Sequence, residues 1–97
     1  MANQPDNEFF NRADAVIDLA NSQIGECSRG KVSASLMYAN ARFSAWISAT
    51  GCRDGEEMAA AKEEALEFFV GQFRTMLEEN LDEYIENFAR YMTRDPE

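Results

Sequence analysis

Carboxylates crowd one stretch near the C-terminal end of the chain. Residues 77–88 hold five of them in twelve positions: Glu78, Glu79, Asp82, Glu83 and Glu86. Such a cluster could serve as a metal site or as a catalytic acid/base pair, but a working pair needs environments that separate the two pKa values, usually by burying one group. At about 100° per residue, these acids fall opposite an apolar stripe. We therefore interpret them as the solvated face of an amphipathic helix.

The chain contains no histidine, which removes further chemistry. Di-metal sites in helical bundles combine inward glutamates with a Glu-x-x-His pair, and serine or cysteine nucleophiles are commonly activated by histidine. Cys27 is accordingly a poor candidate nucleophile. We expect no enzymatic activity, no metal site and no cofactor.

A second group of polar and aromatic residues gives an alternative reading. Tyr38, Asn40, Arg42 and Trp46 lie close together in the sequence. They could line a pocket around the second predicted helix, in a small-molecule-binding protein or a minor enzyme. Asn40 and Arg42 fall on different flanks of that helix, which weakens the idea of a shared pocket.

Cys27 and Cys52 have neither the CxxC spacing of a zinc site nor the density of a disulfide scaffold. A predicted helix of about 17 residues separates them by roughly 25 Å, whereas the Cα atoms of a disulfide lie within about 7 Å. We expect two free thiols, as is usual for a cytoplasmic protein.

The net charge of −9 lies entirely in one half of the chain. Residues 1–53 carry five acids and five bases, whereas residues 54–97 carry thirteen acids and four bases. This field predicts no binding to nucleic acid or to anionic membranes, and it favours a basic protein partner. The one basic cluster, Arg29-Gly30-Lys31, is predicted to be a solvated turn.

Neither a signal peptide nor a membrane span is expected, because no sufficiently long apolar run occurs. The predicted location is the cytoplasm.

The predicted fold is all-α, in a single domain over residues 1–97. We expect helices at about 6–24, 33–50 and 54–92, forming a three-helix bundle or a helical hairpin plus a long C-terminal helix. Glycines separate these segments, and Pro5 and Pro96 leave the interior free of proline.

Capping residues define the predicted helix starts. Asp6 or Asn3 can cap the first helix and Ser33 the second. In the third, Asp54 followed three residues later by Glu57 is a capping-box pattern. Gly71 and Asn80 are positions where this long helix could bend.

Apolar residues at helical spacing predict the core. The first helix has a stripe that includes Phe9, Phe10 and Ile17, and the second has Leu36, Ala39, Phe43, Trp46 and Ile47. The opposite side of the second helix carries small residues, so we expect it to be central and covered on more than one side.

The third helix carries more apolar surface than two shorter helices can cover. At about 38 residues it would span roughly 57 Å, against 25–30 Å for the others. We predict that a second copy covers the excess in a homodimer, unless the helix folds back. Phe68 points away from the main stripe and predicts burial by a partner, although it could also be a singly exposed surface residue. The predicted interface comprises Phe68, Phe69, Phe73, Leu77, Leu81, Tyr84, Ile85 and Phe88.

Three stretches, FFNRADAVIDLAN, VSASLMYANARFSAW and FRTMLEENLDEYIENF, together resemble a small proteobacterial domain family of unknown function. The resemblance implies a short, cytosolic, helical bacterial protein and supplies no catalytic or binding residues. The function expected from the residues is that of an uncharacterised acidic helical protein, acting as a non-enzymatic interaction or accessory module.

Overall fold

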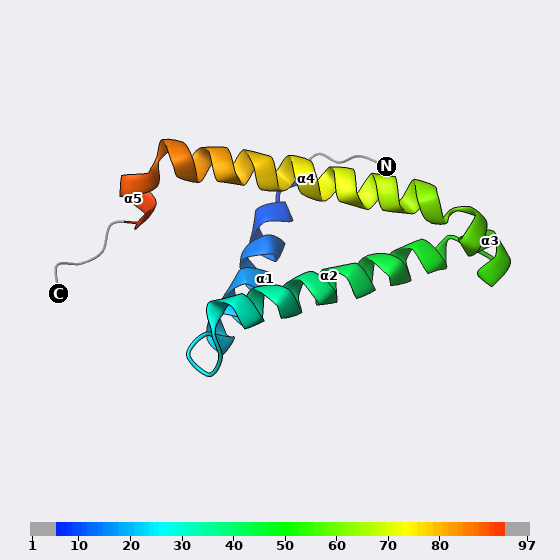
Figure 1. Cartoon of the computed structure of the whole chain (residues 1–97), viewed down its shortest axis with the longest axis horizontal. Coiled ribbons are helices and arrows are strands. Elements are labelled where there is room, and N and C mark those ends of the chain that lie inside the picture. The colour runs from blue at the N-terminus through cyan, green and yellow to red at the C-terminus, as the bar shows by residue number, and fades with distance from the viewer. Residues whose placement is uncertain (1–5, 93–97) are drawn as a thin grey trace. The chain divides into compact units, whose positions relative to one another are not determined.

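The computed structural model describes residues 6–92, and within them it contains five helices and no strand. Figure 1 shows them in chain order: α1 (Phe9–Gln23), α2 (Arg29–Thr50), α3 (Gly55–Ala60), α4 (Lys62–Glu86) and α5 (Phe88–Met92). The predicted all-α class is confirmed. The expected third helix, 54–92, is divided into α3, α4 and α5.

The chain forms two compact units, Met1–Trp46 and Ile47–Glu97, with the boundary inside α2. Each unit is described separately below. None of the helices in the described part of the chain is long and apolar enough to cross a membrane.

In the first unit, α1 begins behind a turn organised by Asp6. The Asp6 carboxylate accepts a hydrogen bond from the Glu8 amide at 2.9 Å and pairs with Arg12 at 3.3 Å. The hydrogen bond from the Glu8 amide is the main cause that lowers the pKa of Asp6, and the hydrogen bond from the Arg12 guanidinium is the next. Asp6 thus orders this turn although Glu8 occupies the N-cap position. Asn3, the alternative cap, lies outside the described residues.

The start of α2 differs from the prediction. The helix begins at Arg29 rather than at Ser33, and the Ser28 hydroxyl accepts a hydrogen bond from the Lys31 amide at 3.2 Å. Ser28 is therefore the capping side chain, and Arg29, Gly30 and Lys31 form the first helical turn instead of a loop. The prediction assigned Gly30 to the loop because glycine is common just after a helix end, whereas Gly30 lies in the first turn of α2.

The loop between α1 and α2 is set by Gly25, whose φ of 111° is the only positive φ among the described residues. Its amide donates to the Cys27 carbonyl at 3.3 Å. This conformation strongly favours glycine, because residues with a side chain rarely adopt a positive φ.

In the second unit, the predicted capping box of α3 is confirmed. The Asp54 carboxylate accepts from the Glu57 amide at 2.8 Å, and the Glu57 carboxylate accepts from the Arg53 amide at 2.6 Å. After the six residues of α3, Ala61 (φ −94°, ψ 3°) interrupts the helix before α4 begins at Lys62. No glycine or proline marks this interruption, so the sequence pattern did not reveal it.

Helix α4 continues through both positions where a bend was considered. Gly71 has helical neighbours on either side, and the Asn80 side chain donates to the Met76 carbonyl at 2.7 Å within the helix. The helix ends instead at Asn87, whose amide and side chain both donate to the Glu83 carbonyl.

Burial is slight throughout the described residues. Val32 is the one buried hydrophobic residue, at 5% exposure. The predicted core stripes of the first two helices are open instead, and in α2 the half-buried positions Ser44 and Ser48 lie on the small-residue side. The exposed members of those stripes include Phe10, Ile17, Leu36, Phe43, Trp46 and Ile47.

Candidate interaction surface

The apolar side of α4 and α5 is a candidate interaction surface in the second unit. Seven of the eight predicted interface residues are between 44% and 72% exposed, and Phe69 is half-buried. The exposed ones are Phe68, Phe73, Leu77, Leu81, Tyr84, Ile85 and Phe88. Because large side chains in contact with water forgo about 1.5–3 kcal/mol each, this surface favours a covering partner.

Two residues missing from the predicted interface extend the same surface toward the N-terminal end of α4. Leu66 and Val70 are both exposed, and at about 100° per residue they share a stripe with Phe73 and Leu77. Their spacing was a usable signal, since Leu77 follows Leu66 by 11 residues, as Leu81 follows Val70.

Phe68 lies apart from that stripe, as the helical spacing predicted. Its ring packs edge-on against Phe69, with centroids 5.1 Å apart and planes at 79°. The contact holds the two rings together and leaves Phe68 49% exposed.

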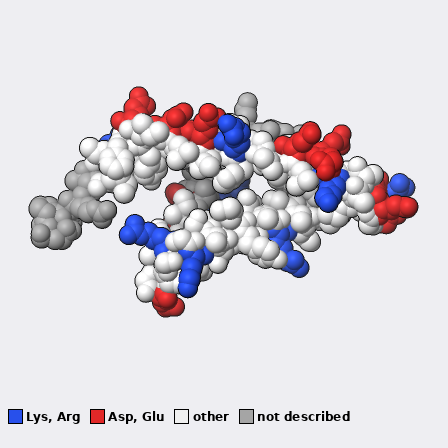
Figure 2. All heavy atoms as spheres, in the orientation of Figure 1, with Lys and Arg blue, Asp and Glu red and all other residues white. Residues whose placement is uncertain are grey.

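The acids predicted to form a solvated face lie along α4, where Figure 2 shows acidic side chains gathered. Glu78, Glu79, Asp82, Glu83 and Glu86 are all exposed. Across residues 6–92, no group of three or more acids or cysteines is arranged to hold a metal ion. The geometry is that of the solvated face of an amphipathic helix.

One of these acids has a structural contact. The Tyr91 hydroxyl of α5 donates a 2.6 Å hydrogen bond to the Glu83 carboxylate, and the Tyr91 ring stacks on Tyr84 with centroids 4.5 Å apart. The Arg90 guanidinium lies 5.5 Å from the centre of the same ring. The hydrogen bond to Glu83 is the main cause that raises the pKa of Tyr91. Together these contacts fix α5 against the last turns of α4.

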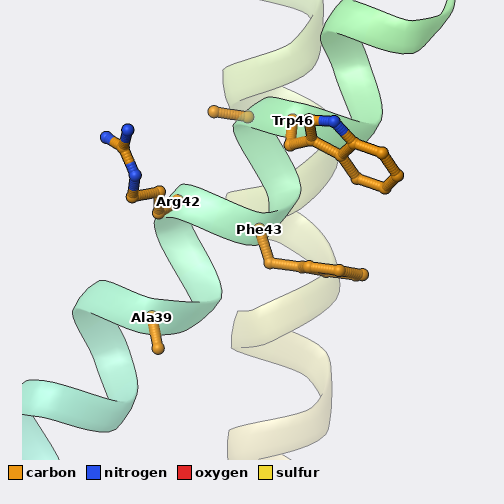
Figure 3. Close-up of a pocket in the computed structure, with 5 residues that line it drawn as sticks. Ala39, Arg42, Phe43 and Trp46 are labelled. Atoms are coloured by element: carbon orange, nitrogen blue, oxygen red, sulfur yellow. The ribbon is translucent and has the colours of Figure 1, made fainter.

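The alternative site on α2 is only partly assembled. A hollow of about 670 Å³ is lined by Ala39, Arg42, Phe43, Ala45 and Trp46. In Figure 3 the Phe43 and Trp46 rings extend to one side of the helix and the Arg42 guanidinium to the other; the ring centroids are 5.7 Å apart. Ligand pockets of this volume usually enclose most of their ligand, whereas one helix supplies every residue that lines this hollow.

Tyr38 and Asn40, the other residues predicted for that pocket, do not line the hollow. The Asn40 side chain accepts a hydrogen bond from the Ser44 hydroxyl at 3.3 Å, and Tyr38 is exposed. The expected separation of Asn40 and Arg42 onto different flanks agrees with this arrangement.

The predicted free thiols are confirmed. Cys27 is exposed in the loop before α2, Cys52 is half-buried after it, and neither forms a disulfide. Each thiol donates only to a carbonyl four residues earlier, Cys27 to Gln23 and Cys52 to Ser48.

These features define a small, acidic, all-helical protein whose described residues leave many large apolar side chains exposed. The chain belongs to the DUF3144 family, described as "Protein of unknown function", which matches residues 9–85. The resemblance to a domain family of unknown function is thereby confirmed.

A solved relative supports the fold. The NMR structure of the protein NB7890A from Shewanella sp. is 39% identical to this chain, with a TM-score of 0.75. The alignment covers 94% of this chain and 98% of that one. Among curated proteins, none matches this chain.

Proposed function

We propose that this protein is a non-enzymatic interaction module that works as a homodimer. The apolar side of α4 pairs with a second copy, and the acidic side remains outside as a surface for a basic protein partner. The observation that carries the proposal is the burial pattern: Val32 alone is buried among the described hydrophobic residues, while large apolar side chains are exposed along every long helix.

The exposed apolar side chains support association. Burying a large apolar side chain gains about 1.5–3 kcal/mol, and α4 alone carries several that are 44% to 63% exposed, among them Leu66, Val70, Phe73, Leu77, Leu81 and Tyr84. A second copy of the chain carries the same apolar surface and can therefore cover it. Twofold dimers are the commonest arrangement of such copies.

The charge distribution is compatible with pairing through the apolar side. Glu79, Asp82 and Glu86 lie roughly opposite Leu77 and Leu81 at about 100° per residue, so they point away from a seam formed by those leucines. Exposed charges that lie farther apart than the screening length, about 8 Å at physiological salt, repel one another only weakly.

Light scattering on the eluting chromatographic peak tests the proposal. We expect a mass near twice the 11.0 kDa of one chain at micromolar concentration. Leu81→Glu should reduce the mass to that of one chain, because it places a charge in the apolar seam. Glu79→Lys on the opposite side is the matched control and should leave the dimer intact. A single-chain mass for the unaltered protein would refute the proposal.

The second candidate function is binding of a small aromatic molecule at the hollow on α2. The contact between the Phe43 and Trp46 rings, which both line the hollow, favours this class of ligand. A thermal-shift screen of such compounds should show a melting temperature that rises with ligand concentration. Trp46→Ala must abolish the rise for the assignment to hold.

A further inference from the structure

The exposed residues of α4 have a spacing that defines how two copies pair. Five of them form what we call the seam: Val70, Phe73, Leu77, Leu81 and Tyr84, each between 44% and 63% exposed. Their separations of 3, 4, 4 and 3 residues read the same in both directions from Leu77. Four residues beyond each end lie Leu66, still in α4, and Phe88, the first residue of α5.

The seam repeats every 11 residues, since Leu66, Leu77 and Phe88 are 11 apart, as are Val70 and Leu81, and Phe73 and Tyr84. Three turns in 11 residues give about 3.67 residues per turn, close to the value of a straight helix. The stripe therefore runs nearly parallel to the helix axis, and a second straight helix can follow it along its whole length.

From this spacing we infer that α4 pairs with α4 of a second copy in antiparallel orientation, with Leu77 at the twofold axis. This inference rests on the proposed homodimer and specifies its seam. In this register Val70 faces Tyr84 of the second copy, Phe73 faces Leu81, and Leu77 faces Leu77.

Side-chain volume favours this orientation. Outside the central layer, each antiparallel layer pairs one aromatic with one aliphatic residue, and Leu66 opposite Phe88 continues the pattern. Parallel pairing would instead place Phe73 on Phe73 and Val70 on Val70, so that bulky and small layers alternate. Helical cores pack best when large residues face small ones across each layer.

Charge favours the same orientation. The C-terminal half of α4, residues 75–86, contains five acids and no base, whereas residues 62–74 contain three acids and two bases. Parallel pairing would bring the two acidic halves together. Antiparallel pairing separates the two copies of Asp82, near the centre of the cluster, by about 15 Å along the axis, beyond the screening length of about 8 Å.

One flank of the seam adds a specific pair. Arg74 and Glu78 are one turn apart on the same side of α4, and antiparallel helices bring equivalent flanks together. Arg74 of one copy then lies beside Glu78 of the other, and the contact occurs twice by symmetry. In parallel pairing, Arg74 would instead lie beside the opposite flank of the second helix, which carries Met76 and Phe69.

Disulfide trapping of the full-length chain tests the orientation. Single cysteines at positions 73, 77 and 81 are introduced into a Cys27→Ser, Cys52→Ser background, and each protein is oxidised under mild conditions. Leu77→Cys is expected to form a covalent dimer alone. Phe73→Cys and Leu81→Cys should each fail alone, because their equivalent positions lie about 12 Å apart along the axis, and a disulfide needs Cα atoms within about 7 Å.

The decisive sample is an equal mixture of the Phe73→Cys and Leu81→Cys chains after subunit exchange. The antiparallel seam predicts a mixed covalent dimer, identified by its mass. Glu79→Cys on the acidic side is the control and should not cross-link. Circular dichroism confirms that each variant remains helical.

The outcomes separate this inference from the proposed function. Covalent dimers from all three single variants would overturn the antiparallel seam and show parallel pairing, with the homodimer retained. A dimer mass by light scattering with no cross-link at any of the three positions would overturn the seam and place the interface elsewhere. A single-chain mass would overturn both, and would indicate that the rest of the same chain covers α4.

Discussion

At the scale of single residues, the contact between Tyr91 and Glu83 joins α5 to α4. Since the neutral hydroxyl is the donor, folding holds the Tyr91 proton and raises the pKa of the group above its ordinary value of 10.0. The contribution to stability is therefore complete below pH 10.0 and is lost as the pH rises through the raised pKa of the folded state.

We expect Tyr91 to appear as a late component in the ultraviolet absorbance titration of the protein. Tyr91→Phe should remove it, and Glu83→Gln should move it to lower pH, because the neutral amide no longer disfavours a phenolate. Glu86→Gln serves as the control. Identical titration curves for the unaltered protein and Glu83→Gln would contradict the contact.

Contacts between residues close together in the sequence could be predicted where the spacing allows only one interpretation. Asp54 and Glu57 have the spacing of a capping box and form it. Ser28 was missed because Ser33 has the same chemistry and stands closer to the apolar stripe of α2. Tyr91 was missed because its partner Glu83 is eight residues away, on a separate helix.

At the scale of the helices, replacing either of two glycines that differ in backbone conformation should change the free energy of unfolding in opposite directions. Gly71 is helical, and a Cβ added there meets nothing within 4 Å. It also lies roughly 120° from the seam at 100° per residue. Gly71→Ala should therefore increase the free energy of unfolding by about 0.5–1 kcal/mol, without changing the mass of the assembly.

Gly25 also has open space around its Cβ position, but its φ of 111° strains any other residue. Gly25→Ala should lower the free energy of unfolding by roughly 1–2 kcal/mol. Urea unfolding measures both variants. Equal shifts in the same direction would show that the two backbone conformations do not differ as described.

The sequence predicted that the C-terminal part of the chain is helical, but it did not predict the division of this part into α3, α4 and α5. Strong helix formers and the scarcity of proline predict continuous helix from residue 54 onward, but the interruptions at Ala61 and Asn87 involve no strong breaker. Asn87 ends α4 through hydrogen bonds from its own amide and side chain to Glu83, and asparagine elsewhere, at Asn80, remains inside the helix.

At the scale of the whole molecule, periodicity identified the apolar faces but not what covers them. The stripes containing Phe43 and Ile17 were predicted to form an internal core, and both residues are exposed. An amphipathic pattern records only that one face avoids water. The identity of the cover depends on contacts between distant parts of a chain, or between chains, which local spacing does not encode.

We expect the fold to depend on association. Among the described residues Val32 is the one buried hydrophobic residue, whereas folding must offset a large loss of conformational entropy. If a second copy covers the seam as proposed, stability depends on that pairing, and unfolding releases two chains from each assembly.

Thermal unfolding followed by circular dichroism over a hundredfold range of protein concentration tests this claim most directly. We predict that Tm rises with concentration, because mass action favours the associated folded state, and that Leu81→Glu lowers Tm and removes the dependence. Glu79→Lys should retain it. A Tm that is independent of concentration, in a protein that stays helical at the lowest concentration, would contradict the account.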